Sequence, residues 1–297
     1  MRTAARRRAL ALVGVILLSA LGVASEEAAM EAESLAVLES SEDPKELQAA
    51  ATRLASSGDS QALDALGRKL GSERLLSLLD SPEAYAGEPR RLRVRRILDE
   101  LAANPSPRAQ GVLVALARSP AFQQEPGRVD LLIGVSARIR PPPPDLVEFW
   151  RRHCEPEDGF GPLTVRALVD NDTEASIGVL EQKLADPRFE PDEKRAWLRL
   201  EVIRHRNSPH VLRAADRLVR AGRDPVLRMD LVEVLFDYRP AEWYTPAVSA
   251  SPPPLSAYTP EARALASGLG RWVLATLEPP QRTRVAIEAF LRTIDAT

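Results

Sequence analysis

Residues 170–181 carry oxygen-bearing side chains at the spacing of a calcium-binding loop. Such a loop takes oxygen ligands from positions 1, 3, 5 and 12 and places an apolar side chain at position 8. These positions hold, in order, Asp170, Asp172, Glu174, Glu181 and Ile177. Position 6 requires glycine for a sharp turn, whereas this sequence has Ala175 there. The alternative is that Asp172 caps a helix, and we assign no metal ligand.

Imidazole and thiol groups are adjacent at His153 and Cys154, with Glu155 and Asp158 close by in the sequence. Together they could form a metal site or an activated nucleophile. Adjacent residues on a helix point in different directions, however, and no second histidine or cysteine recurs at ligand spacing. The pattern favours a hydrogen-bonded pair at a helix C-terminus, and we assign no catalytic or cofactor-binding residue.

Two groups of arginines could bind an anionic partner through their guanidinium groups. The denser group comprises Arg90, Arg91, Arg93, Arg95 and Arg96. Of these, Arg91, Arg95 and Arg96 lie along one side of a helix and could bind a phosphate or an acidic partner, but a solvated helix face with Leu92 and Ile97 pointing inward is the simpler interpretation. Arg213, Arg217 and Arg220 share one face of a second helix. They face either a groove or acidic neighbours such as Asp216.

Aromatic residues are scarce, and we expect the tryptophans to pack between helices. They are Trp150, Trp197, Trp243 and Trp272. The pair Trp243-Tyr244, which precedes Thr245-Pro246, is the best candidate for an exposed aromatic contact with a partner. No aromatic residue alternates with the arginines of residues 90–96, so stacking of single-stranded nucleic acid is poorly supported.

The elements that position these residues are predicted to be helices. Alanine, leucine and arginine favour helices, and the alternating runs that strands need are scarce. A short polar residue before proline marks a helix start, because its side chain binds free N–H groups and proline has none. This dipeptide occurs at Asp43-Pro44, Ser81-Pro82, Ser106-Pro107, Ser208-Pro209, Asp224-Pro225 and Thr259-Pro260. We therefore predict an all-α protein.

The helix starts recur at regular intervals. Starts near Asp172, Pro191, Ser208 and Asp224 imply that one helix pair occupies about 35 residues, the period of an α-solenoid. Residues 43–70 contain a complete pair, in which Gly58-Asp59 makes the turn. Neither helix of such a pair can bury its apolar stripe alone, so antiparallel pairs are expected to stack against one another.

This pattern resembles the HEAT-repeat family, particularly the short bacterial type related to phycobilin lyases. The family's Asp-Pro-x-Val-Arg start is matched by residues 224–228, and its Gly-Asp second helix by Gly58-Asp59 through Leu66. The matches cover residues 43–70 and, more loosely, 171–237, about a third of the chain. The resemblance implies an α-solenoid and says little about activity.

The N-terminus has the features of an export signal. Arginines within residues 2–8 precede an uncharged run over 9–24, and Val23-Ala24-Ser25 offers a cleavage site. We predict that 1–25 is a signal peptide, with a short retained membrane anchor as the alternative. The uncharged run is shorter than the ~20 residues that span a bilayer, which favours cleavage.

The remaining chain is predicted to contain four segments. They are an acidic spacer or frayed helix at 26–42, HEAT-like repeats at 43–248, a proline-rich loop at 249–259 and a C-terminal helical cap at 260–297. Within the repeats, 71–105 and 119–128 are predicted to be irregular inserts. Pro141–Pro144 is predicted to form an extended break. The array is therefore either interrupted there or divided into two arrays with a hinge.

Charge and cysteine content narrow the possible functions. The chain has 40 basic and 42 acidic residues, and four of the basic ones lie in 1–25, which leaves a net charge of −6 for residues 26–297. An acidic chain is a poor candidate for general nucleic-acid binding. The single cysteine, Cys154, excludes an intramolecular disulfide. The sequence contains no phosphate-binding glycine loop, nucleophile elbow or His-Glu-x-x-His motif.

We predict an exported scaffold or adaptor that binds a protein or peptide partner through a helical repeat surface, without catalysis and without a cofactor. The expected location is the periplasm or the exterior, with membrane attachment only through a retained N-terminal segment. Two alternatives stay open at this point. One is an enzyme or cofactor-handling protein of the bilin-lyase-like repeat type, which rests on the resemblance alone. The other is a structural element of an envelope assembly.

Overall fold

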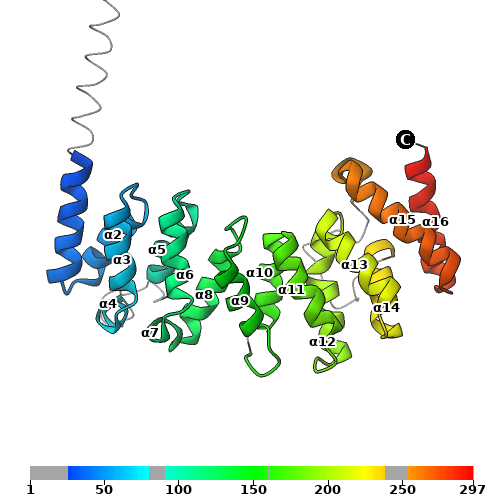
Figure 1. The fold of residues 1–297 in the computed structure, drawn as a ribbon, viewed down its shortest axis with the longest axis horizontal. Helices are drawn as coiled ribbons and strands as arrows, with labels where there is room; N and C mark the ends of the chain where they lie inside the picture. Colours follow the sequence, from blue (N-terminus) through cyan, green and yellow to red (C-terminus); the bar gives the residue numbers. More distant parts are fainter. Residues whose placement is uncertain (1–25, 80–90, 160, 238–252, 297) are drawn as a thin grey trace, which may run out of the picture. The chain divides into compact units, whose positions relative to one another are not determined.

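The computed structural model describes residues 26–79, 91–159, 161–237 and 253–296. Every regular element in these residues is a helix and none is a strand, which confirms the all-α prediction (Figure 1). None of these helices is long and apolar enough to cross a membrane. The chain divides into two units, Met1–Val135 and Ser136–Thr297.

The first unit contains two helix pairs that pack side by side. Its elements are a helix over residues 26–40, α2 (Pro44–Ala55), α3 (Ser60–Leu70), α4 (Glu73–Leu79), α5 (Arg91–Ala103), α6 (Pro107–Leu116), α7 (Pro120–Gln123) and α8 (Pro126–Ser136). Helix α2 packs on α5 and α3 packs on α6, so the apolar stripe of each helix is buried by the next pair. Leu54, Leu63 and Leu66 are fully buried in this core.

Three predictions for this unit need correction or refinement. The described residues of the expected irregular inserts at 71–105 and 119–128 are largely helical, because they contain α4, α5 and α7. Residues 26–40 are helical as well, with Ser34 and Leu38 buried, and Glu31 accepts a hydrogen bond from the Ser57 hydroxyl. Acidic composition concealed the apolar contacts of this helix.

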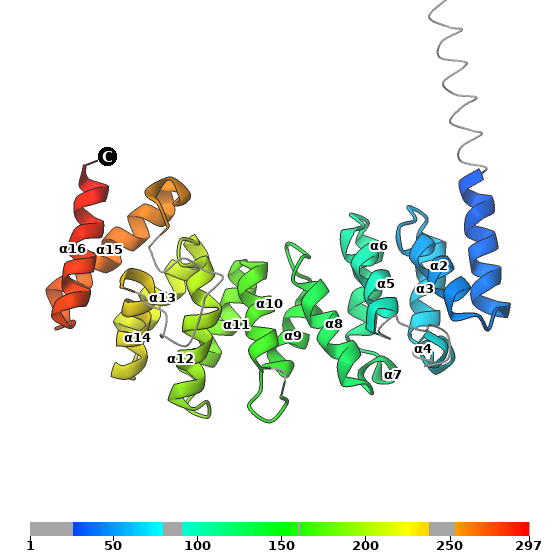
Figure 2. The same cartoon turned by 180° about the vertical axis from the view of Figure 1, so that it is seen from behind.

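The second unit arranges its helices in two rows. Its elements are α9 (Pro144–His153), α10 (Gly161–Asn171), α11 (Glu174–Ala185), α12 (Pro191–Leu200), η2 (Val202–His205), α13 (Pro209–Ala221), α14 (Pro225–Phe236), η3 (Leu255–Ala257), α15 (Pro260–Thr276) and α16 (Gln281–Asp295). In one row α9, α11, α13 and α15 contact each other in succession, and in the other α12 contacts α14, which contacts α16. Figure 2 shows the same helices from behind.

Helix starts follow the predicted polar-proline pairs. Helices α2, α6, α13, α14 and α15 each begin at the proline, and the preceding side chain accepts a backbone N–H of the first turn. Each such cap contributes about 1 kcal/mol to stability. Ser81-Pro82 lies outside the described residues. In the first turn of α2, Glu46 accepts from the Ser41 hydroxyl at 2.8 Å.

The proline break is shorter than predicted. The Arg140-Pro141 peptide bond is cis, and Pro143 is extended at φ −60° and ψ 149°. Pro144 is already the first residue of α9, because proline fits the first turn, where its missing N–H is not needed. The expectation that all of Pro141–Pro144 is non-helical is therefore wrong at Pro144.

In each unit an asparagine side chain links neighbouring turns, half-buried at Asn104 and buried at Asn171. The side-chain amide of Asn104, after α5, donates to the backbone oxygens of Ala55 and Ser57 at 2.9 and 2.8 Å. Asn171, at the end of α10, donates in the same way to Ala137 and Ile139 at 2.9 and 2.8 Å. Each asparagine side chain thus binds backbone oxygens at or just after the C-terminus of an earlier helix. The contact recurs although the sequences around Asn104 and Asn171 differ.

Candidate functional site

The segment predicted to resemble a calcium loop, residues 170–181, contains the end of α10, a short turn and the first part of α11. Asn171 uses its amide to join two turns, and Thr173 caps α11 in a reciprocal hydrogen-bond pair with Ser176. The cap is therefore Thr173 and not Asp172, which has a left-handed φ of 49° and accepts from the Ser208 hydroxyl. Within the described residues, no three His, Cys, Asp or Glu side chains form a group that could hold a metal ion.

The remaining carboxylates of this segment are engaged by cations. Asp170 lies 3.3 Å from His205 Nε2 and 3.2 Å from an Arg204 nitrogen. The hydrogen bond from His205 is the main reason that the pKa of Asp170 lies below its usual value. Glu181, the expected twelfth position of the loop, accepts from Arg217 at 2.6 Å. These oxygens therefore take part in ion pairs that connect helices.

His153 and Cys154 end α9 but face different surroundings. His153 Nδ1 lies 2.5 Å from an Asp158 carboxylate oxygen, and its ring packs edge-on against Phe149. Cys154 is fully buried, and burial raises the pKa of its thiol to about 12. A thiol that stays protonated is a poor nucleophile, so this pair gives the enzymatic alternative no support.

The acidic residue next to this pair has a separate role. Glu155 accepts from the buried ammonium of Lys183 and lies 2.8 Å from an Arg188 nitrogen. The hydrogen bond from Lys183 is the main reason that the pKa of Glu155 is lowered. Glu155 is therefore a structural ion-pair partner.

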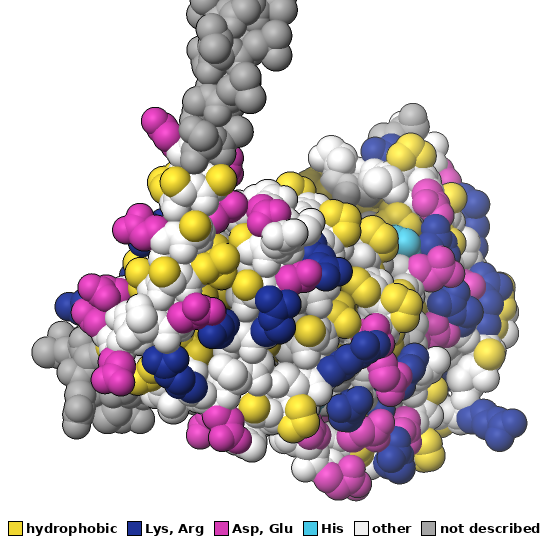
Figure 3. Space-filling model, turned by 60° about the vertical axis from the view of Figure 1, so that its left-hand side comes forward, with side chains coloured by type: hydrophobic (Ala, Val, Ile, Leu, Met, Phe, Trp, Pro, Cys, Tyr) yellow, Lys and Arg dark blue, Asp and Glu magenta, His cyan; other side chains and the backbone are white. Residues whose placement is uncertain are grey.

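The arginine cluster of α5 does not act as one surface. Arg93 is buried and donates to the Leu79 backbone oxygen at 2.8 Å, whereas Arg95 is exposed and pairs with Asp99 at 3.4 Å. Ile97 points inward as predicted. Arg90 and the side chains of Arg91 and Leu92 lie outside the described residues. Figure 3 shows basic and acidic side chains interspersed on the face in view, an arrangement that offers no continuous basic stripe.

The arginines of α13 pair with acidic neighbours, which is one of the two predicted outcomes. Arg213 pairs with Glu261 on α15 and Arg217 with Glu181 on α11. Arg220 pairs with Asp216 on its own helix at 2.7 Å and lies 5.1 Å above the ring of Trp272.

Two other tryptophans are buried in the second unit. Trp150 donates its indole N–H to the Ser136 hydroxyl at 2.9 Å, and Trp197 packs edge-on against Phe189. The predicted exposed pair Trp243-Tyr244 lies outside the described residues. The aromatic contact with a partner therefore stays a prediction.

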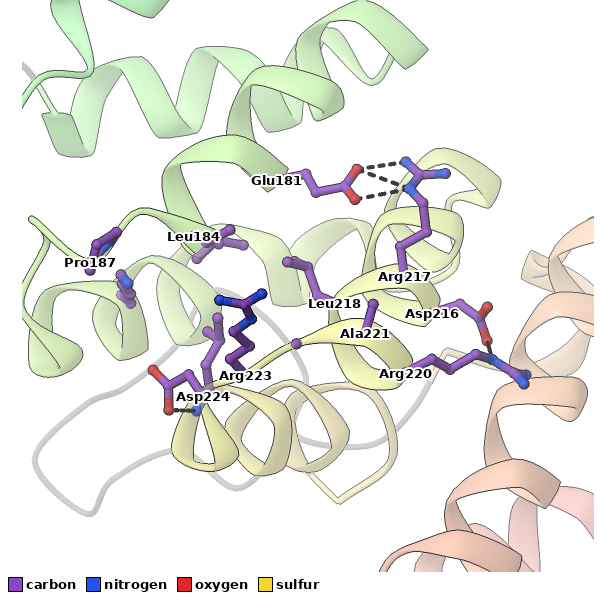
Figure 4. A pocket seen from close by; sticks show the side chains of 14 residues that line it. Glu181, Leu184, Pro187, Asp216, Arg217, Leu218, Arg220, Ala221, Arg223 and Asp224 are labelled. Atoms are coloured by element: carbon purple, nitrogen blue, oxygen red, sulfur yellow. Dashed lines mark hydrogen bonds and ion pairs between the residues drawn. The ribbon is translucent and has the colours of Figure 1, made fainter.

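A cavity of about 910 Å³ opens between α11, α12, α13 and α14 (Figure 4). Its apolar wall is formed by Leu184, Ala185, Pro187, Leu218, Ala221 and Leu227. Its charged lining consists of Glu181, Lys194, Asp216, Arg217, Arg220, Arg223 and Asp224. An apolar wall with a few convergent charged groups is typical of a binding site. Neither His153 nor Cys154 lines it.

The ends of the helices shape this cavity. Helix α13 ends at Gly222, where an added β-carbon would lie 2.1 Å from the Leu218 backbone oxygen. No larger residue fits there unless the turn shifts. The chain then enters α14 through Asp224, whose carboxylate accepts the N–H groups of Val226 and Leu227 at 2.9 and 3.1 Å. Gly222 and the Asp224 cap thus hold the turn between α13 and α14, which forms part of the rim of the cavity.

Most charges that line the cavity are neutralised by neighbours. Arg217 pairs with Glu181, Arg220 pairs with Asp216, and the Asp224 carboxylate binds backbone N–H groups. Lys194 and Arg223 differ, because neither side chain makes a hydrogen bond or an ion pair with any part of the chain that the structure describes. The backbone hydrogen bonds leave the charge of Asp224 in place, so the described lining, with four basic and three acidic side chains, has a net charge of +1.

A smaller cavity of about 400 Å³ lies between α3 and α6 of the first unit. Arg108 on α6 binds both carboxylate oxygens of Asp64 on α3, as Arg217 does with Glu181. The hydrogen bond from Arg108 is the main cause that lowers the pKa of Asp64. The first unit thus repeats the inter-helix ion pair of the second beside a smaller space.

Sequence reasoning singled out Arg217 and Arg220 but missed the cavity that they line. Lys194 gave no signal, because it lies in a charged stretch of α12 that reads as a solvated face. The chain matches no family model, and no curated protein or solved structure matches it.

Proposed function

We propose that this protein is an exported scaffold or adaptor that binds a segment of a partner protein in the cavity lined by α11–α14, without catalysis. The observation that carries the proposal is the cavity itself, with its apolar wall and charged rim. A volume near 900 Å³ can accommodate several side chains of an extended peptide. Large apolar and charged groups that meet in one recess are typical of sites that anchor a partner.

The proposed architecture is a HEAT-like α-solenoid. One support is the row in which α9, α11, α13 and α15 contact each other in succession, and the second row, in which α12 contacts α14 and α14 contacts α16. A further support is the asparagine contact that recurs at Asn104 and Asn171. In such repeats one row of helices lines an extended binding surface. Helices α11 and α13 belong to one row and provide most of the cavity lining.

The proposed location is the periplasm or the exterior of the cell. The arginine-rich start, the uncharged run and the small residues at 23–25 support export. Fractionation of cells that express the full chain, with N-terminal sequencing of the product, tests this part. We expect a product that begins near residue 26, and a cytoplasmic product with an intact N-terminus would contradict export.

A peptide selection tests the binding function. The purified protein is immobilised, and a phage library of random peptides is selected on it. Ala221→Trp fills the cavity from an exposed position of its wall, and Ala289→Trp is the matched control on the exposed face of α16. Thermal unfolding of both variants verifies that they are folded.

We expect enriched peptides whose Kd rises at least about tenfold on Ala221→Trp, because the indole occupies the space that the peptide needs. The same peptides should bind Ala289→Trp as they bind the unmodified protein. A selection that yields no peptide sensitive to Ala221→Trp would contradict the proposed function.

A further inference from the structure

Two lysines of the second unit are equally buried but differ in their partners. Lys183 and Lys194 are each 5% exposed. The Lys183 ammonium pairs with Glu155 and lies 5.9 Å above the ring of Phe189. The Lys194 ammonium has no acidic partner and no hydrogen bond among the described residues. Since buried charges are nearly always paired, Lys194 lacks a partner that a buried lysine normally has.

The position of Lys194 shows where such a partner would enter. Lys194 lines the cavity, and its ammonium is not among the fully enclosed polar atoms that lack a partner. The amine is therefore accessible from the cavity although most of the side chain is covered. An anion inside the cavity could therefore contact this amine.

The remaining charges favour an acidic occupant. Glu181 and Asp216 are held by Arg217 and Arg220, and Asp224 caps α14, so these carboxylates do not bind Lys194. Arg223 is exposed at the rim and equally unpaired among the described residues. The apolar wall around both cations suits an apolar side chain next to the acid.

We infer that Lys194 binds an aspartate or glutamate side chain of the partner segment, while a neighbouring apolar side chain of that segment packs on Leu184, Leu218 and Leu227. Arg223 binds a second acidic side chain at the rim. This inference rests on the proposed function and specifies its partner as a peptide in which acidic and apolar residues alternate.

Two designed peptides test the inference by fluorescence anisotropy. One is a fluorescein-labelled peptide of alternating leucine and aspartate, and the other has asparagine in place of each aspartate. Both are amidated at the C-terminus, so that only side chains carry carboxylates. They are titrated with the unmodified protein and with Lys194→Gln, Lys194→Arg and Lys69→Gln, the last a control in the first unit.

The aspartate peptide is expected to bind the unmodified protein at least about tenfold more tightly than the asparagine peptide, because its carboxylate pairs with the Lys194 ammonium beside the apolar wall. Lys194→Gln should reduce this ratio below about threefold, Lys194→Arg should retain part of it, and Lys69→Gln should leave it unchanged. Lys194→Gln should melt at the same temperature as the unmodified protein, since the ammonium that it removes makes no ion pair or hydrogen bond with the described residues.

Two results would overturn the inference. One is equal binding of the aspartate and asparagine peptides, and the other is an unchanged ratio in Lys194→Gln. If both peptides nevertheless lost affinity on Ala221→Trp, the cavity would still bind peptides and the proposed function would stand. If neither peptide bound, the acidic partner would be excluded, while the outcome of the phage selection would decide the proposed function separately.

Discussion

Arg217 of α13 holds both carboxylate oxygens of Glu181 on α11, with Nε at 2.9 and 3.2 Å and Nη2 at 2.6 Å. In the sequence these residues belonged to two unrelated candidates, a calcium loop and an arginine face. The structure joins them into one bidentate pair at the wall of the cavity. The pair connects two helices of one row, and Glu181 is the main reason that the pKa of Arg217 is raised.

A double-mutant cycle on Glu181→Gln and Arg217→Gln measures this connection. Because both side chains are partly exposed, we expect a coupling of about 0.5–1 kcal/mol in the free energy of urea unfolding. The pair Glu148 and Arg151 within α9 is the matched control, and its coupling should be about 0.3 kcal/mol. A coupling for Glu181 and Arg217 no larger than in the control would show that the inter-helix pair adds no stability.

Removal of the Asn171 side chain should destabilise the second unit. Asn171→Ala eliminates two hydrogen bonds from a fully buried amide, and we expect a loss of about 2 kcal/mol in urea unfolding. Asn171→Asp should cost more, because a carboxylate would face the oxygens of Ala137 and Ile139. Asn207→Ala, which removes one exposed hydrogen bond to Ala257, serves as the mild control. Equal effects of Asn171→Ala and Asn207→Ala would contradict the role assigned to Asn171.

Cys154 should resist thiol reagents in the folded protein. Burial and a thiol pKa of about 12 leave almost no thiolate at pH 8, so labelling should be at least about a hundredfold slower than in guanidinium. Since the folded pKa exceeds the unfolded value, the contribution of this thiol to stability is complete below the usual pKa of 9.0. It is lost as the pH rises toward 12. Rapid labelling of the native protein would show that the α9 end opens readily.

Glu155 should make stability depend on acid pH. Glu155→Gln leaves the Lys183 ammonium buried without its anion, and we expect a loss of about 2 kcal/mol near pH 7. Because the folded pKa of Glu155 is lowered, its contribution is present above the usual value of 4.5 and is lost as the pH falls through the folded pKa. The difference in Tm between the variant and the unmodified protein should therefore shrink on acidification. A difference in Tm that stays the same at every pH would show that the pKa of Glu155 does not differ between the folded and the unfolded protein.

Helix positions could be predicted because their signals are local. A cap such as Asp224 and the proline that follows act within one turn, so Asp224-Pro225 marks the start of α14 without tertiary information. The charges that line the cavity depend instead on residues far away in the chain. Glu181 and Arg217 are 36 residues apart, and the burial of Lys194 depends on how α12 packs. Composition and spacing do not encode such packing, so the sequence gives no sign that Lys194 is buried beside a cavity.

Buried arginine illustrates the same limit. Arg93 stands in the densest basic stretch of the chain, yet its guanidinium donates to the Leu79 backbone oxygen inside the first unit. Arg95 lies two positions further along the same helix and is exposed. Two positions on a helix differ by about half a turn, so neighbouring arginines can have opposite environments. Charge density alone therefore does not show which arginines of this stretch are exposed.

Packing in each unit also bears on how quickly the chain can fold. Helices mainly contact partners that lie one to three elements away, as α2 does with α3 and α5 and as α11 does with α10 and α13. Short separations along the chain lower the entropy lost when each contact closes, and such topologies fold fast. Each unit can therefore assemble one helix pair at a time, without waiting for remote parts of the polypeptide to meet.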